Sequence, residues 1–277
     1  MKRNLTENEI EYLEELNLFD NVINVTQTIS LNQHGIQTDG RGLRAMKLFT
    51  RQTLTGLSLH KLLPRPNKNK SIDEDIWDIS SIASLTRNIV EGYISLYYFG
   101  IEKISESEAQ LRFFILQLHR NVEWYNIRKD VNLEEDELKE FENGIIEQKK
   151  RIENHPYLLK LSTNQRKRAI QGVEMYKTKY DFEKEISFCK DLRRDYRHLS
   201  NLVHPLPLSI ERIDNENGRG IGSSRDISYC MICLMIARRY FAATTIGIAD
   251  YFEKELAIPF AKDLETIRSL VNKGFTE

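Results

Sequence analysis

Residues 180–208 of the chain read YDFEKEISFCKDLRRDYRHLSNLVHPLPL, and this stretch decides the predicted fold. Its apolar residues recur at steps of three and four, which is the period of a helix with one buried face, over about six turns. Pro205 and Pro207 end the pattern, because proline lacks the amide hydrogen and the freedom in φ that a helix interior requires. The expected buried stripe consists of Phe188, Leu192, Tyr196, Leu199 and Val203.

A second stripe of the same predicted helix is polar and contains Arg194, Arg197, Asn201 and His204. Because Arg197 and His204 are seven residues apart, close to two helical turns, their side chains are expected to leave the helix in nearly the same direction. Histidine exchanges a proton near neutral pH, and arginine stays charged and binds phosphate oxygens. The pair is suited to cleaving RNA without a metal, with His204 as general acid or base and Arg197 stabilising the phosphate. The alternative interpretation is a solvated helix face opposite the core.

The same residues resemble a known family. Residues 197–204, Arg-His-Leu-Ser-Asn-Leu-Val-His, fit the R-x(4–6)-H pattern of HEPN domains. The longer run of residues 196–205 resembles Y-x-x-L-S-x-x-x-H-P, a signature of a large group of all-helical, HEPN-like bacterial proteins. His198 departs from the pattern, because asparagine is commoner directly after the arginine, and the six-residue gap is at the long end of the range.

This resemblance implies a fold and a function. The expected fold is an all-α, antiparallel multi-helix bundle with a HEPN-like core, which forms a homodimer. Arg197 and His204 from both subunits would line a cleft and cleave RNA without a metal, as the toxic arm of phage defence or of a toxin–antitoxin pair. Several members of such families are non-catalytic. The second hypothesis is therefore a helical interaction module, an adaptor or antitoxin-like subunit, in which Arg197 binds an acidic partner and His204 caps its helix.

Supporting residues are expected on two helices. Arg87 and Glu91 stand one turn apart on a helix predicted over residues 73–101. In the HEPN-like group an arginine and a glutamate on an early helix accompany the R-x-H helix, which implies that these two flank the cleft and orient His204 or a phosphate. The alternative is a surface ion pair that stabilises the helix by a few tenths of a kcal/mol. The remaining supporting residues are Arg194, His198, Ser200 and Asn201.

Composition agrees with a helical protein. The 277 residues are 40% apolar and 29% charged, with only 13 Gly and 6 Pro, and alternating β-branched runs are almost absent. The net charge is −1 and the pI is about 6.6, so any contact with RNA must be local. Arg41, Arg44, Lys47 and Arg51 form one basic stripe that is either such a contact or a solvated face.

Location and cofactors follow from the apolar and cysteine patterns. The residues after Met1 are polar, so no secretory segment is expected and the protein is predicted to be cytoplasmic. The most apolar run, residues 229–248, contains Arg238 and Arg239, which favours a core helix over a membrane span. Cys230 and Cys233 have no second pair and no nearby histidine, so buried thiols are expected, with no metal and no cofactor.

Two polar segments divide the helices. The linker Pro64–Lys70 is predicted not to pack and marks a boundary between an N-terminal helical subdomain, residues 1–63, and a main bundle, residues 71–277. Residues 205–225 are rich in Gly, Asn and Ser and are predicted to form a flexible flap over His204. Nucleotide binding by the glycines of residues 218–222 is a third possibility that the spacing disfavours, because no strand precedes them.

Overall fold

The computed structural model describes residues 4–69, 75–131, 135–205, 207–213, 219–220 and 222–272, and these contain helices and no strand. The predicted all-α class is therefore confirmed for the described chain. It forms two compact units, one made of Met1–Ile101 with Ile186–Glu277 and the other of Glu102–Glu185.

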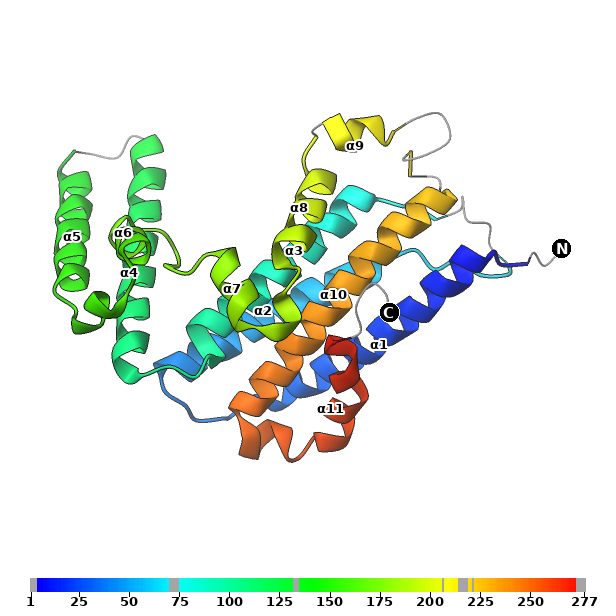
Figure 1. Cartoon of the computed structure of the whole chain (residues 1–277), viewed down its shortest axis with the longest axis horizontal. Coiled ribbons are helices and arrows are strands. Elements are labelled where there is room, and N and C mark those ends of the chain that lie inside the picture. The colour runs from blue at the N-terminus through cyan, green and yellow to red at the C-terminus, as the bar shows by residue number, and fades with distance from the viewer. Residues whose placement is uncertain are drawn as a thin grey trace. The chain divides into compact units, whose positions relative to one another are not determined.

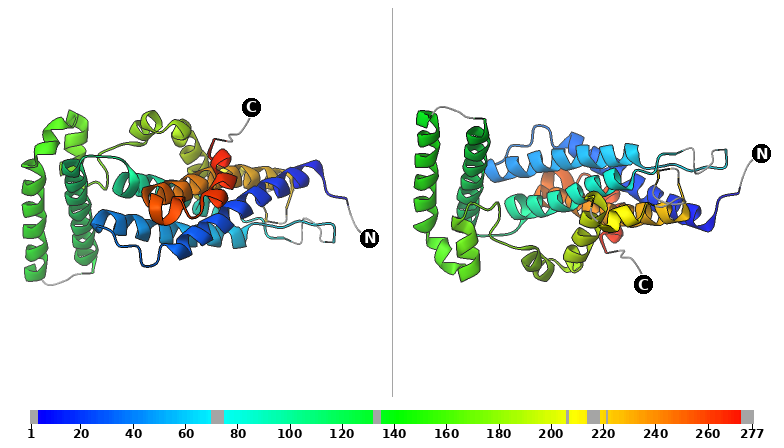
Figure 2. Two further views of the ribbon diagram at one scale, coloured as in Figure 1. Left: turned by 90° about the horizontal axis from the view of Figure 1, so that it is seen from below. Right: turned by 90° about the horizontal axis from the view of Figure 1, so that it is seen from above.

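The first unit is a helical bundle built around one apolar helix (Figure 1). This helix, α10, packs against α1, α2, α3 and α11, and α8 packs on α3. Figure 2 shows α1, α2, α3 and α10 side by side, with the consecutive helices α1, α2 and α3 alternating in direction. The elements are α1 (Glu7–Asn32), α2 (Gly40–Leu62), α3 (Ile79–Leu96), η2 (Tyr97–Ile101), η4 (Ser187–Cys189), α8 (Leu192–Val203), α9 (Pro207–Glu211), α10 (Ser224–Tyr251), η5 (Glu253–Ala257), α11 (Ala261–Arg268) and η6 (Ser269–Val271).

The expected core helix is α10, and it buries both of its arginines. Arg238 is fully buried and donates to the Glu15 carboxylate of α1 and to the Leu270 carbonyl. Arg239 is 3% exposed and donates to the Phe188 carbonyl. Although α10 is long and apolar enough to cross a membrane, 72% of its most apolar window is buried inside the structure.

The helix boundaries show where local signals decide the structure. The spacing of Thr6 and Glu9 predicts a capping box, and the two residues form it at the start of α1, with each side chain bonded to the other residue's amide. Helical spacing in the sequence predicts one helix from the Thr6 cap to about Asn17 and a second from Phe19 to about Gln33, but α1 is one helix of 26 residues. No Gly or Pro interrupts it, and its buried residues continue at helical spacing.

The buried face of α2 differs from the predicted one. Helical spacing in the sequence predicts a core face made of Leu43, Met46, Leu54, Leu57 and Leu62. Leu43 and Leu54 are instead 49% and 61% exposed. A different set of residues is buried: Gly42, Ala45, Phe49, Gln52, Thr53, Gly56 and Leu59. A Cβ added to Gly56 would lie 2.4 Å from the ring of Phe241 on α10. The prediction was wrong because it weighted large apolar side chains, whereas close packing of α2 on α10 needs a residue with no side chain at position 56.

The linker after α2 is packed at its beginning, contrary to the prediction. Pro64 and Pro66 are buried, the Pro64 carbonyl accepts a hydrogen bond of 2.9 Å from the Tyr12 hydroxyl, and Arg65 binds both carboxylate oxygens of Asp20. Proline stops a helix, but its ring is apolar and can pack. The two compact units divide the chain at residues 101–102 and 185–186.

The second unit is a smaller helical body, in which α4 and α5 lie side by side (Figures 1 and 2). Glu108 accepts from Arg112, Tyr157 and Tyr176 in its interior. Burial alone raises the pKa of Glu108, but the two tyrosine hydrogen bonds and the Arg112 charge outweigh burial and lower this pKa. The elements are α4 (Glu106–Asp130), α5 (Glu135–Glu153), η3 (Pro156–Lys160), α6 (Thr163–Ile170) and α7 (Lys179–Glu185).

Candidate functional site on α3 and α8

The stretch predicted as one six-turn helix is broken. It consists of α7, the 3₁₀ turn η4 and α8, which begins only at Leu192. Ile186 is the residue at which the chain re-enters the first unit. Its backbone is extended, φ −115° and ψ 108°, and its side chain is buried. A periodic apolar pattern does not show that the chain leaves one compact unit for another within the same run, so the prediction of one helix was wrong.

Packing on two neighbouring helices holds α8 in place. Leu192, Leu199 and Leu202 are buried, and Asp195 on the same face is 1% exposed. The Asp195 carboxylate lies 3.6 Å from the Arg239 guanidinium of α10. Burial raises the pKa of Asp195, although Arg194 and Arg239 act in the opposite direction. At the other end, the Ser80 hydroxyl of α3 donates to the Leu202 carbonyl at 3.1 Å.

His204 is the first residue after α8. Its amide donates to the Ser200 carbonyl at 3.2 Å, and its own carbonyl accepts from the buried Ser209 hydroxyl at 2.6 Å. Its backbone is extended, φ −84° and ψ 142°, so the chain turns away from the helix axis here. The His204 side chain is exposed to solvent. Two backbone hydrogen bonds therefore fix the residue while its ring remains accessible.

The Arg87 guanidinium of α3 is the hub of the site. Its Nε donates to Glu91 Oε1 at 3.1 Å, its Nη2 donates to the Tyr196 hydroxyl, and its Nη1 lies 3.3 Å from His204 Nε2. The guanidinium also stacks on the Tyr196 ring, 4.5 Å from the ring centroid. Tyr196 on α8, His204 directly after α8 and Glu91 on α3 therefore orient a single cation.

The Tyr196 hydroxyl forms hydrogen bonds with two charged groups, the Arg87 guanidinium and the Glu91 carboxylate. Burial raises the pKa of Tyr196, a hydrogen bond to the Glu91 carboxylate raises it further, and the Arg87 charge lowers it. The phenol donates to Glu91 and accepts from Arg87. Tyr196 belongs to the predicted buried stripe, and its polar role beside Arg87 was not predicted. The signal was present in the signature, because tyrosine is its first residue, and a phenol has both an apolar body and a polar tip.

The structure places the other predicted site residues in different surroundings. Arg197 is exposed, and within the described ranges its guanidinium makes no hydrogen bond or ion pair, including with His204. The Asn201 amide donates to the Arg197 carbonyl at 3.0 Å. Ser200 contributes its carbonyl to His204. Ser200 and Asn201 thus make backbone hydrogen bonds near the end of α8.

Arg194 and His198 lie among other partners. Arg194 pairs with Asp191 and Asp195, both at 3.2 Å. His198 is half-buried and stacks on Tyr229 of α10, with the ring centroids 6.4 Å apart. Burial and the nearby Arg194 charge lower the pKa of His198, which favours its neutral form.

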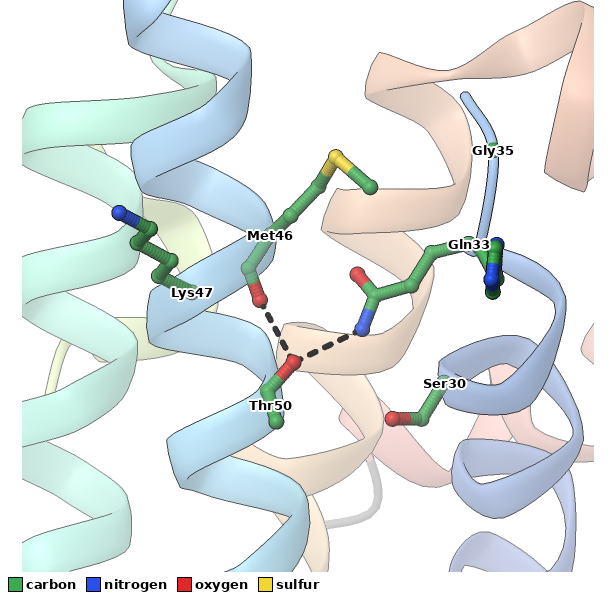
Figure 3. A pocket seen from close by; sticks show the side chains of 7 residues that line it. Ser30, Gln33, Gly35, Met46, Lys47 and Thr50 are labelled. Carbon is green, nitrogen blue, oxygen red and sulfur yellow. Dashed lines mark hydrogen bonds between the residues drawn. The ribbon is translucent and has the colours of Figure 1, made fainter. Parts of the chain in front are cut away.

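A pocket of about 460 Å³ lies between α1 and α2 and contains none of the predicted site residues. Figure 3 shows Gln33 reaching across it to donate to Thr50 Oγ1 at 2.9 Å, while Thr50 donates to the Met46 carbonyl. Because the Thr50 hydroxyl hydrogen is already used, the Gln33 amide must be the donor. The pocket is lined by Ser30, Gln33, His34, Gly35, Met46, Lys47 and Thr50.

The glycine motif lies partly outside the described residues, and the cysteine motif lies in the buried part of α10. Residues 218 and 221 of the glycine run lie outside the described residues, as do 206 and 214–217 of the predicted flap. Cys230 and Cys233 are buried free thiols, and burial raises the pKa of Cys233 to about 12. The described residues contain no group of three or more His, Cys, Asp or Glu that could hold a metal ion.

Comparisons of the chain with family models, curated proteins and solved structures return no match.

Proposed function

We propose that the protein is a metal-independent, HEPN-like endoribonuclease with His204 as its general base. The observation that carries the proposal is the exposed His204 ring, whose Nε2 lies 3.3 Å from the Arg87 guanidinium. A proton acceptor beside a fixed cation suits the cleavage of a phosphodiester, because the base removes a proton while the cation stabilises phosphate charge. Arg197 adds a second exposed cation two turns earlier on α8.

The proposed reaction is an in-line transesterification. His204 Nε2 takes the proton of the 2′-hydroxyl, the O2′–P bond forms and the P–O5′ bond breaks. The 5′-oxygen leaves with a proton from solvent, and His204 returns its own proton to solvent. The products are a 2′,3′-cyclic phosphate and a 5′-hydroxyl. We place this activity in the cytoplasm, in a homodimer, as a toxin or effector of phage defence that a protein partner such as an antitoxin restrains.

The test is cleavage of mixed RNA by the purified protein in EDTA. His204→Ala is expected to lower the rate by about 10²–10⁴-fold, the range that general acid–base catalysis contributes. His34→Ala removes another exposed histidine, on the connection after α1, and serves as the matched control. Equal cleavage by wild type and His204→Ala, or none by wild type, would overturn the proposal.

The second candidate is a non-catalytic interaction module. Its favouring observation is Arg197, an exposed arginine that could bind an acidic partner. This hypothesis expects His204 to be buried with its ring nitrogens bonded to backbone. The exposed ring and the Arg87 side-chain contact instead support the nuclease. If the RNA test is negative, capture of a partner by wild type but not by Arg197→Glu would support the module.

A further inference from the structure

We propose that Arg87 is a phosphate-responsive latch on His204, an inference that rests on the proposed function. In the free protein the guanidinium occupies the Nε2 lone pair that the base must use. An RNA phosphate draws Arg87 away from His204 and so frees Nε2 at the moment when substrate is bound. The same side chain would then switch from blocking the base to stabilising the phosphate.

The contact with Arg87 determines which nitrogen of the His204 ring carries the hydrogen. Arginine is always protonated in proteins and has five N–H donors and no acceptor. The contact between Arg87 Nη1 and His204 Nε2 can therefore be a hydrogen bond only if Nε2 accepts. A neutral His204 in this position carries its proton on Nδ1. The Arg87 contact thus selects one of the two ring tautomers.

The three partners of Arg87 use three of its five N–H donors. Glu91 uses the single Nε–H, Tyr196 uses one hydrogen of Nη2, and His204 uses one hydrogen of Nη1. Among the described residues, no partner uses the second N–H of either terminal nitrogen. Arg87 is 23% exposed, so an approaching anion can reach the guanidinium before the contact with His204 breaks. A phosphate can be bound by these two donors first.

A phosphate oxygen is a better acceptor for Arg87 Nη1 than His204 Nε2 is. The distance of 3.3 Å from Nη1 to Nε2 lies beyond the common range of about 2.7–3.2 Å, and the acceptor is a neutral ring. A phosphate oxygen is charged, and charge-assisted hydrogen bonds are shorter and roughly twice as strong. The phosphate therefore displaces Nε2 as the partner of Nη1. Glu91 and Tyr196 retain the rest of the guanidinium, so the movement is small.

The experiment reads the His204 ring by ¹⁵N NMR of the full chain in mildly alkaline solution. Free wild type is expected to show the proton on Nδ1 and a hydrogen-bonded Nε2. Saturation with a 2′-deoxy oligonucleotide, which cannot be cleaved, should shift the Nε2 resonance as the Arg87 contact is lost. In Arg87→Met, which removes every donor, the Nε2–H tautomer should gain population and this response to the oligonucleotide should disappear.

The control and the contradicting outcomes separate the latch from the nuclease. Arg151→Met changes an exposed arginine on α5 and should leave the His204 signals as in wild type. A free wild type with its proton on Nε2, or a wild-type ring that does not respond to the oligonucleotide, overturns the latch. If either result is obtained and RNA is still cleaved in a reaction that depends on His204, only the latch proposal is overturned and the nuclease proposal stands. If the predicted tautomer and the response to the oligonucleotide are observed but the protein cleaves no RNA, the nuclease proposal is overturned. The phosphate-responsive contact between Arg87 and His204 then stands.

Discussion

The Nη1 of Arg87 lies 3.3 Å from the Nε2 of His204, although the two residues are 117 positions apart in the chain. The contact joins α3 to the residue that ends α8. It is possible because Leu192, Leu199 and Leu202 pack the helix in one orientation and Ser80 bonds to its last turn. A resemblance in sequence placed Arg87 near His204, but the direct contact of their side chains is a property of the fold.

Removal of the Tyr196 hydroxyl should weaken the site without unfolding it. In Tyr196→Phe the aromatic ring can still stack on Arg87, but the hydrogen bonds to Arg87 and Glu91 are lost. A hydrogen bond contributes about 0.5–1.5 kcal/mol net, so the RNA cleavage rate is expected to fall roughly three- to tenfold. The measurement is the initial rate in EDTA, with far-UV circular dichroism to check helix content.

The matched control is Tyr125→Phe. The Tyr125 hydroxyl also donates to a glutamate, Glu142, at 2.6 Å, but in the second unit. The same loss of a tyrosine–carboxylate bond there should leave the cleavage rate unchanged. A Tyr196→Phe protein as fast as Tyr125→Phe would show that the phenol does not position Arg87.

Local signals were sufficient for much of the fold. The spacing of Thr6 with Glu9 and of Ser162 with Gln165 predicts two helix N-termini, and both occur, at the starts of α1 and α6. The end of α8 also follows from sequence, because Pro205 comes directly after His204. These features depend on a few neighbouring residues, so no information about the tertiary structure is needed to predict them.

Features that depend on distant partners were missed. Gly56 faces the core only because Phe241 lies opposite, and nothing near Gly56 in sequence indicates this. Asp195 could have been found, because an acid on an apolar stripe together with arginines in an apolar helix predicts a buried pair. The side-chain contact between Arg87 and His204 requires the crossing of α3 and α8, which local periodicity does not determine.

Gly56 should not tolerate a methyl group. In Gly56→Ala the new Cβ would lie 2.4 Å from the Phe241 ring, closer than real contacts, and α2 would have to move away from α10. Overpacking of this kind destabilises by about 1–3 kcal/mol, which exceeds the gain of roughly 1 kcal/mol from replacing a helical glycine. Urea unfolding measures the change. Adding Phe241→Leu should restore part of the loss, and a Gly56→Ala protein as stable as wild type would contradict the packing.

Stability should decline in alkali because of buried thiols. Cys233 has a pKa of about 12 in the fold against an ordinary value of 9.0, owing to burial. Between about pH 9 and pH 12 the folded state therefore holds a proton that the unfolded state has lost, and the free energy of unfolding falls by up to about 1.4 kcal/mol per pH unit. Chemical denaturation at several pH values should show a shallower decline for Cys233→Ala. An equal slope would show that the thiol does not contribute.

Replacing only one residue of the buried pair Arg238 and Glu15 should strongly lower the free energy of unfolding. Arg238 is fully buried. It donates hydrogen bonds to the Glu15 carboxylate of α1 and to the Leu270 carbonyl. Arg238→Met leaves a buried carboxylate without its cation, and loss of one partner of a buried pair typically destabilises by about 3–5 kcal/mol. The double variant Arg238→Met with Glu15→Leu removes both charges.

This double variant is expected to recover much of the stability, because apolar packing often replaces a buried pair at little cost. Urea unfolding of the wild type, both single variants and the double variant gives the coupling free energy directly. A large favourable coupling would assign the pair to joining α1 and α10. Additive losses in the two single variants would show instead that each side chain acts independently, with Arg238 held mainly by the Leu270 carbonyl.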